Sequence, residues 1–509
     1  MSFQNHINPV YFKTWIQDNH ENKRLAILSF ATIIISFILF KFLYPFPNFG
    51  SESDAYMEAA ATNQSIHILP IGYSTFLRLF SSFSRSSTLL VLFQYLFLEI
   101  SILYFLFTLK YLLPLGKWLF RILLGCCVLN PLVLQLSNLI TNDALFAGLS
   151  LLWITQLLWI IYRPQLQLVL FHSLVLLSAF TTSNDALYYP IFSVCVIAFA
   201  NFHLKSKIVG IVLIIVLVGG FIANTVYQYD NETGTQQYSA LRGWQLAATA
   251  LYGYAHASPD PAEKMPLRFR NLHDCVNQYL TSLQGVPFFF RSDHNIYNFY
   301  ISDEHSPLRV YMTNKWSKDS STPSFKRWAT AGSLYADYGL FLIKKHPGAF
   351  LKYHVASNLV NFYVPPANSL SIYNSGSDTV SKMATSWFAW KNNKLFTRYN
   401  YKIILVSIYF PIVSAFINML FILSFITFSC LGGLKSRDPH AKRLLGWILA
   451  LWCSNMVLHA LEGHVELRSQ LFFIIVSFTF LLLLLTSIMQ IKPIYHENYS
   501  SLNSTDQFI

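Results

Sequence analysis

Apolar runs of about twenty residues recur along the chain and are separated by polar segments. A run of this length can cross the hydrocarbon core of a bilayer as an α-helix. The pattern therefore predicts an all-α polytopic membrane protein, a single bundle of about ten transmembrane helices. The expected spans are 25–43, 88–113, a third run that ends near 136, 144–162, 166–180, 186–202, 208–226, an eighth run that ends at 430, 444–461 and 471–489.

Two long polar segments interrupt this series. The first is the loop 44–86, and the second is the segment 227–400. Within the second, 238–254 and 333–364 have helical apolar spacing with aromatic residues, which predicts helices on or near the bilayer, whereas 255–325 is predicted to form loops. The expected organisation is a tail 1–24, an N-terminal membrane module 25–226, the segment 227–400, C-terminal spans 401–489 and a tail 490–509.

The charges give the bundle an orientation. Only 12% of residues are charged and 54% are hydrophobic, which excludes a soluble enzyme with a single anchor. A net charge of +12 can indicate a nucleic-acid partner, but here Lys and Arg gather in short loops such as KSRDPHAKR at 435–443. Because such loops face the cytoplasm, both tails are predicted to be cytoplasmic, with 44–86 and 227–400 outside. We therefore expect a multi-pass membrane protein with its site on the outer face and no nucleic-acid partner; for a bacterial inner membrane, that face is the periplasmic one.

Several common catalytic motifs are absent from the sequence. It contains no Gly-rich phosphate loop, no HExxH and no GxSxG, so nucleotide hydrolysis, zincin protease and serine hydrolase chemistry lack support. Five of the six cysteines lie inside apolar runs and none forms a CxxC pair, so no disulfide framework is predicted. Any chemistry must therefore come from other polar residues.

The stretch SESDAYMEAAATNQSIHILPIGY, residues 51–73, lies in the first loop and holds two acids four residues apart. If Ser51 or Ser53 caps a short helix, Asp54 and Glu58 share one of its faces. Two carboxylates beside a Pro-Ile-Gly-Tyr turn at the membrane surface suggest a site. The alternative is a solvated interfacial helix whose acids only favour the positive helix terminus.

Two similar pentads, TNDAL at 141–145 and SNDAL at 183–187, begin the fourth and sixth spans on the side of the first loop. N-capping explains both, because Ser, Thr, Asn and Asp are favoured where a helix begins, and we prefer it for Asp185. Asp143 is the better functional candidate, since its turn can face the first loop across the bundle.

The segment HALEGHVELR, which ends at Arg468, packs two His, two Glu and one Arg between two apolar spans. Charged groups beside the hydrocarbon face a cavity or pair with one another. We interpret Arg468 as a cation for phosphate, which a guanidinium binds through two parallel hydrogen bonds, with Glu466 orienting it. One alternative is a plain outer loop in which these two residues pair. Another is a metal site from His459, His464 and Glu462, whose spacing fits no motif.

A basic, aromatic stretch from Lys344 to His354 has helical spacing suited to lying along the lipid headgroups. This places Lys352 and His354 where they can approach an anionic carrier phosphate. The alternative is that the stretch only anchors the segment 227–400 at the interface.

In order and sidedness these motifs resemble the GT-C superfamily of membrane glycosyltransferases, such as protein mannosyltransferases and aminoarabinose transferases, which use a polyprenyl-phosphate-linked sugar as donor. The family carries Asp-x-Tyr, small residues and a Pro-x-Gly-Tyr-like turn in the first outer loop, an acid in the second outer turn and Glu-x-Arg before a late span. The matching residues are Asp54, Tyr56, Ala59, Ala60, Pro70, Gly72, Tyr73, Asp143, Glu466 and Arg468. Some members have two adjacent acids in the first loop, where this chain has Glu52 and Asp54 separated by Ser53.

The resemblance implies transfer of a sugar from a polyprenyl-phosphate donor to a hydroxyl-bearing lipid, glycan or protein. The transfer would invert the configuration of the sugar and take place at the non-cytoplasmic face, where the protein is in contact with membrane lipids. Asp54 would take the acceptor proton, and Asp143 would position the acceptor or a metal. Arg468 would bind the leaving phosphate. A divalent metal is compatible with this scheme but is not required by the sequence. The remaining assignments are donor-phosphate contacts from His464, Glu466, His354 and Lys352, and acceptor contacts from Glu58, Tyr56 and Tyr73.

Two other functions fit a bundle with buried charges and basic loops. A transporter or flippase for a lipid-linked solute usually has two related halves, which this chain lacks, because seven expected spans precede 227–400 and three follow it. A polymerase or ligase of surface polysaccharide also has a long outer loop but lacks the acidic first loop. The product distinguishes the three, since one sugar, a whole glycan or no covalent change is expected.

Overall fold

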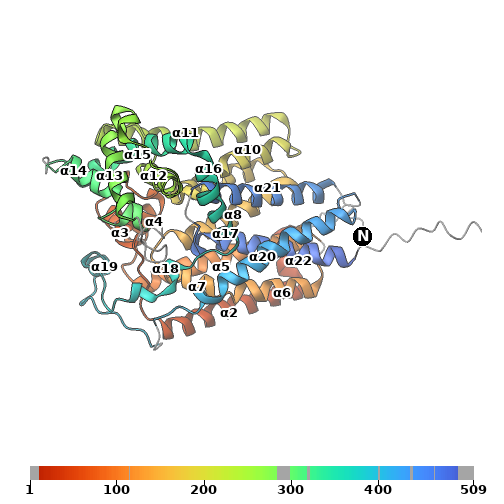
Figure 1. Ribbon diagram of the computed structural model, residues 1–509. Helices are drawn as coiled ribbons and strands as arrows, with labels where there is room; N and C mark the ends of the chain where they lie inside the picture. The colour runs from red at the N-terminus through yellow and green to blue at the C-terminus, as the bar shows by residue number, and fades with distance from the viewer. Residues whose placement is uncertain are drawn as a thin grey trace, which may run out of the picture.

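The chain folds as a helical bundle with a helical layer over one end (Figure 1). The computed structural model describes residues 11–113, 115–283, 298–317, 321–398, 402–435, 439–462 and 465–490. These residues form helices and three isolated β-bridges, and no strand is found among them. The predicted all-α class is therefore confirmed.

Within the described residues, eight helices are long and apolar enough to cross a membrane. The fifth and sixth expected spans correspond to shorter apolar helices, α9 (Leu166–Thr182) and α10 (Tyr189–Phe199). The polytopic architecture is confirmed, while ten full-length spans remain a prediction. The long helices are α2 (His20–Leu43), α5 (Ser87–Leu112), the broken span α6 and α7 (Lys117–Val128 and Pro131–Asn138), α8 (Asp143–Tyr162), α11 (Leu204–Thr233), α20 (Val406–Cys430), α21 (Pro439–Glu462) and α22 (Leu467–Met489).

Two prolines explain why α7 and α10 are short. Proline lacks the N–H that continues a helix, so it is favoured in a first turn, where that N–H has no partner within the helix. Pro131 begins α7, and the side chain of Asn130 caps that helix by accepting a hydrogen bond from the N–H of Leu132 at 3.0 Å. Pro190 occupies the first turn of α10, which leaves the preceding residues to a separate 3₁₀ turn, η1 (Asn184–Ala186).

We call the layer at the end of the bundle opposite the label N in Figure 1 the cap. Residues 255–325 were predicted to form loops, which is wrong in part, because α13 and α14 lie there. The other cap helices include the predicted 238–254 helix as α12. The helix α1 (Phe12–Asp18) lies at the other end of the bundle. The cap consists of helices from the first loop and from the segment after α11: α3 (Ser53–Ala61), α4 (Ile71–Ser81), α12 (Ala240–Tyr254), η2 (Ala262–Lys264), η3 (Leu267–Phe269), α13 (Arg270–Ser282), η6 (Asn298–Ser302), α14 (Pro307–Lys315), α15 (Ser324–Lys345), α16 (Pro347–Ala349), η7 (Phe350–Val355), α17 (Ala356–Tyr363), α18 (Asn368–Ser371), η8 (Tyr373–Gly376) and α19 (Lys382–Trp387).

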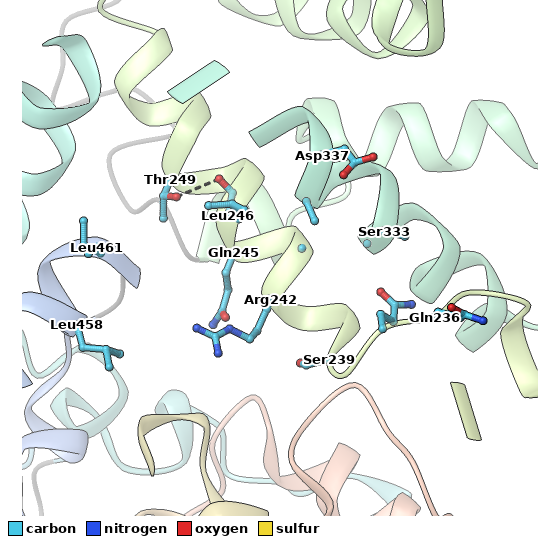
Figure 2. Close-up of a pocket in the computed structure, with 14 residues that line it drawn as sticks. Gln236, Ser239, Arg242, Gln245, Leu246, Thr249, Ser333, Asp337, Leu458 and Leu461 are labelled. Atoms are coloured by element: carbon cyan, nitrogen blue, oxygen red, sulfur yellow. Dashed lines mark hydrogen bonds between the residues drawn. The ribbon is translucent and has the colours of Figure 1, made fainter. Parts of the chain in front are cut away.

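Close packing of α12 against α15 builds the centre of the cap. A side chain at Gly243 would overlap the carbonyl oxygen of Gly332, so only glycine permits this approach of the two backbones. The rings of Trp244 and Trp328 stack beside this contact, with centroids 4.7 Å apart and planes 13° apart. A groove of about 580 Å³ runs along the helix pair (Figure 2).

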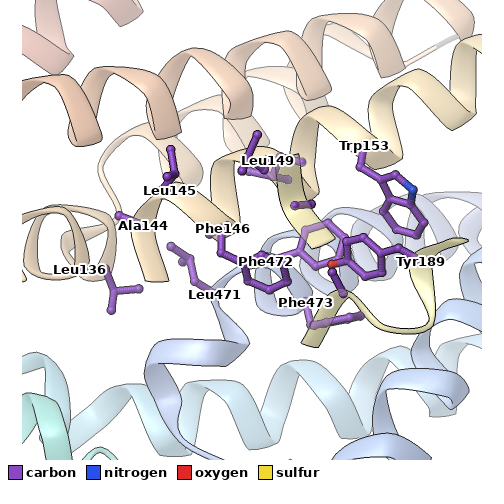
Figure 3. Packing of buried hydrophobic residues seen from close by; sticks show 14 of the residues in the cluster. Leu136, Ala144, Leu145, Phe146, Leu149, Trp153, Tyr189, Leu471, Phe472 and Phe473 are labelled. Carbon is purple, nitrogen blue, oxygen red and sulfur yellow. The ribbon is translucent and has the colours of Figure 1, made fainter. Parts of the chain in front are cut away.

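The bundle core fixes the cap-side ends of α8 and α22 against each other. Figure 3 shows Leu145 and Phe146 of α8 close to Leu471 and Phe472 of α22. Further along α8, the rings of Trp153 and Tyr189 stack at 3.9 Å. Because these contacts are buried and apolar, they hold the first residues of both helices in register at the cap.

Candidate functional site

Three carboxylates surround the guanidinium of Arg468, the second residue of α22. Glu52 accepts two hydrogen bonds, from Nη1 to Oε2 and from Nη2 to Oε1, both at 3.0 Å. Glu466 accepts from Nε at 2.8 Å, and Asp143 accepts from Nη1 at 3.3 Å. The Arg468 side chain is only 14% exposed. We call these four residues the ion cluster.

Backbone pairing brings the first loop to the start of α8, although the two are about ninety residues apart. The N–H of Asn48 donates to the carbonyl of Asn138 at 2.8 Å, and the N–H of Ile140 donates to the carbonyl of Asn48 at 3.0 Å. This short parallel bridge places Glu52, in the turn before α3, beside Asp143, the first residue of α8.

Each of the other two carboxylates is fixed by a hydroxyl group as well as by the arginine. Thr141 donates to Asp143 Oδ2 at 2.5 Å, and Ser369 donates to Glu466 Oε2 at 2.5 Å. Such charge-assisted hydrogen bonds are short and strong. The N–H of Leu467 also donates to the carbonyl of Pro366 at 2.9 Å, so the start of α22 is tied to the cap.

The ion cluster lines a cavity of about 120 Å³ between the bundle and the cap. Asp185, His459, Tyr56 and Gln245 also line it. With four carboxylates against one guanidinium, these side chains carry a formal charge of −3 when the histidine is neutral. The cavity therefore favours positive charge and disfavours an anion that does not bind the guanidinium.

Asp185 differs from the acids of the ion cluster. Its carboxylate makes no hydrogen bond or ion pair within the described part of the chain, and its side chain is half-buried at the cavity. We predicted N-capping here, and Ser183 supplies the cap of η1, because its hydroxyl accepts the hydrogen bond from the Asp185 N–H at 3.2 Å. Asp185 lies in the first turn of η1 but does not cap it through its own side chain. The carboxylate is thus left for the cavity.

The two acids singled out in the first loop point away from the cavity. Asp54 and Glu58 share one face of α3, as their spacing predicted, but that face is exposed to solvent. Asp54 accepts a hydrogen bond from Ser381, just before α19, at 2.6 Å. The geometry therefore favours neither as a base or an acceptor contact in this cavity, and Glu52 occupies the position we expected for Asp54.

Two tyrosines of the first loop occupy the buried side of the same region. Tyr56 lines the cavity, and its ring packs edge to face on Tyr73, with centroids 5.0 Å apart. Tyr73 lies behind it and donates its hydroxyl to Gln94 at 2.7 Å. Burial, reinforced by the charge of Asp143, holds the pKa of the Tyr73 phenol well above its usual range, so it stays protonated. Tyr73 therefore supports Tyr56 without reaching the cavity.

Only some of the residues assigned to the donor phosphate lie at the cavity. Arg468 and Glu466 lie at the cavity, whereas Lys352 is exposed on η7 and lies over the ring of Tyr353, with Nζ 5.1 Å from its centroid. His354 is fully buried, and burial lowers its pKa to about 4, so it is neutral at pH 7 and cannot hold an anion by charge. His464 lies outside the described residues.

Among the described residues, no cluster of three or more His, Cys, Asp or Glu side chains is arranged to hold a metal ion. The carboxylates of the ion cluster bind a guanidinium instead. Of the three metal ligands considered, His459 is buried at the cavity, and its Nδ1–H donates a hydrogen bond to the carbonyl of Asn455 at 3.0 Å. The side chain of Glu462 and all of His464 lie outside the described part.

Sequence reasoning missed Glu52 and Gln245. Glu52 carried a signal, because it is the first of the three acids in the first loop, but α3 begins only after it and helical spacing cannot say where its side chain points. Gln245 lies in a helix that was predicted from apolar spacing alone, and no pattern distinguishes it from the other amides of α12. Comparison of the chain with protein-family models, curated proteins and solved structures gave no match, so the resemblance to the GT-C superfamily rests on the sequence motifs.

Proposed function

We propose that the protein is a membrane glycosyltransferase that moves a sugar from a polyprenyl-phosphate donor to a hydroxyl group, with inversion, at the non-cytoplasmic face of a bacterial inner membrane. One observation carries the proposal: a largely buried arginine and four carboxylates from distant segments line one cavity at the membrane-cap boundary. The orientation follows from the basic loops, which put the cap outside.

The charge of the cavity suits glycosyl transfer. When the bond from the anomeric carbon to the phosphate oxygen lengthens, positive charge develops on the sugar ring, as in an oxocarbenium ion. Fixed carboxylates at that point stabilise the transition state more than the neutral ground state. Asp143, Asp185 and Glu466, which line the cavity, supply them.

The donor phosphate binds Arg468 in place of Glu52. The two parallel hydrogen bonds from Nη1 and Nη2 to the Glu52 carboxylate have the geometry in which a guanidinium holds a phosphate. A phosphate diester carries one negative charge, so the exchange leaves the charge next to Arg468 unchanged. Asp143 and Glu466 keep the guanidinium in position meanwhile, since each is also held by a hydroxyl.

Asp185 takes the proton of the acceptor hydroxyl. The oxygen attacks the anomeric carbon from the side opposite the phosphate, the carbon–oxygen bond to the phosphate breaks, and the phosphate leaves with the electron pair. A general base works best when accepting a proton breaks no ion pair. Asp185 meets this condition, whereas the other three acids each pair with Arg468.

The test measures transfer by the purified protein in liposomes. The donors are tritium-labelled monosaccharides on undecaprenyl or dolichyl phosphate, and the acceptors are a bacterial lipid extract and oligosaccharides. We expect one donor to give a labelled product, and Asp185→Asn to lower its rate by about two to four orders of magnitude. Asp54→Asn is the matched control and should keep the rate within a few fold. Absence of product from every donor, or full activity of a folded Asp185→Asn protein, would overturn the proposal.

A further inference from the structure

A second hollow lies next to the cavity and has a different chemistry. The groove of about 580 Å³ is bounded by α12, α15 and the cap-side end of α21. Figure 2 shows Arg242 and Gln245 extending from α12 toward the side of Leu458 and Leu461, with Asp337 on α15 at the far end. Gln245 lines both the groove and the cavity, so the two hollows meet at its side chain.

The polar lining of the groove consists mainly of groups that both donate and accept hydrogen bonds. Amides come from Gln236, Gln237 and Gln245, and hydroxyls come from serine and threonine side chains. Sugar hydroxyls also donate and accept, so such groups match them without a charge. The Gln245 amide makes no hydrogen bond with any other described residue, and it is half-buried at the junction with the cavity.

The two charged side chains that line the groove have opposite signs. Arg242 lies near the junction, and Asp337 accepts a hydrogen bond from Arg268 at 2.8 Å at the exposed rim. The groove lining is therefore formally neutral, while the cavity lining carries −3. A neutral ligand fits this balance better than an anion or a cation.

Apolar side chains form another part of the groove lining. Leu458 and Leu461 of α21 line it across from Arg242 and Gln245, and Leu246 adds apolar surface on α12 itself. Pyranose rings have an apolar face of C–H groups, and small-molecule sites combine apolar surface with a few placed polar groups. At several times the volume of the cavity, the groove accommodates more than one sugar ring.

We propose that this groove binds a neutral saccharide of two or more rings, whose end enters the cavity past Gln245 as the acceptor hydroxyl. The acceptor role rests on the proposed transferase function, whereas saccharide binding does not. The proposal assigns to the acceptor a glycan, and not a protein side chain or a phospholipid headgroup.

The test measures binding without any donor. The full chain is placed in lipid nanodiscs, because sugar-based detergents would compete, and the probes are maltotriose, cellotriose, mannotriose and chitotriose. Saturation-transfer NMR reports which probe binds. Ser333→Trp fills the groove, and Leu340→Trp is the matched control, since Leu340 is exposed on the same helix and does not line the groove.

We expect at least one trisaccharide to bind, Ser333→Trp and Gln245→Ala each to weaken binding by about tenfold, and Leu340→Trp to leave it unchanged. Because no donor is present, binding is measured apart from the reaction, which separates this proposal from the transferase function. Binding of no trisaccharide, or binding that is indifferent to both groove variants, would overturn it. Displacement of the saccharide by inorganic phosphate in an Arg242-dependent manner would also overturn it, because the groove would then be an anion site.

Discussion

The cavity and the groove share Gln245 but differ in the polar groups that line them, since the cavity is lined by charged side chains and the groove mainly by uncharged ones. In the cavity, charged groups are brought together from 52, 143, 466 and 468, and each acid of the ion cluster is satisfied by the same guanidinium. In the groove, uncharged amides and hydroxyls dominate and the two charges balance. On our two proposals, the cap end keeps the cavity, where charge would change during a reaction, apart from the groove, where a neutral ligand would be held.

The strongest test of this contrast removes the centre of the ion cluster. Arg468→Gln leaves four carboxylates in one small cavity without a cation, so we expect the protein to lose about 3–5 kcal/mol of stability and its transfer activity. Thermal unfolding in nanodiscs measures the first. Arg468→Lys keeps the positive charge but cannot bridge all three acids of the ion cluster, so its stability should lie between those of the wild type and Arg468→Gln. Unchanged unfolding of Arg468→Gln would show that the carboxylates are held by other groups.

Removing the competitor of the phosphate should act in the opposite direction. Glu52→Gln abolishes the negative charge that occupies Nη1 and Nη2 of Arg468, so the KM for the donor should fall by roughly tenfold while kcat changes little. Steady-state kinetics with the labelled donor separates the two constants. If kcat instead falls as steeply as in Asp185→Asn, Glu52 is the base and our assignment of roles is reversed.

On the groove side, the helix pair that forms it can be pushed apart by one methyl group. Gly243→Ala places a Cβ against the carbonyl of Gly332, which should destabilise the cap by about 1–3 kcal/mol and weaken saccharide binding. Gly219→Ala is the control, because its Cβ meets no atom within 4 Å in α11 and alanine favours a helix. Equal unfolding temperatures for the two variants would mean that α12 and α15 separate without cost.

Much of the fold follows from hydrophobic periodicity, because a span of twenty apolar residues has one stable solution in a bilayer. The cap is harder, since α13 and α14 are short and polar and depend on tertiary contacts. For the site, Asp143, Glu466 and Arg468 were predicted because a charge next to a span needs a partner. Asp54 was preferred to Glu52 because helix spacing favours residues inside a helix, but the acid that reaches Arg468 stands in the turn before it.

The smallest effect that we expect is on the pH dependence of stability, and it comes from His354, a histidine of the cap that has no role in either proposal. His354 is fully buried with a pKa of about 4, against 6.5 for an exposed histidine, so the unfolded chain binds its proton first as the pH falls. The contribution of the neutral imidazole to the free energy of unfolding is present above pH 6.5 and is lost progressively between pH 6.5 and 4. At pH 5.5 the free energy of unfolding should be about 1 kcal/mol lower than at neutral pH. Replacing the imidazole in His354→Gln keeps a polar side chain that does not titrate. Unfolding temperatures measured from pH 4 to 8 should therefore depend less on pH in the variant, and parallel curves for the two proteins would show that other groups cause the acid sensitivity.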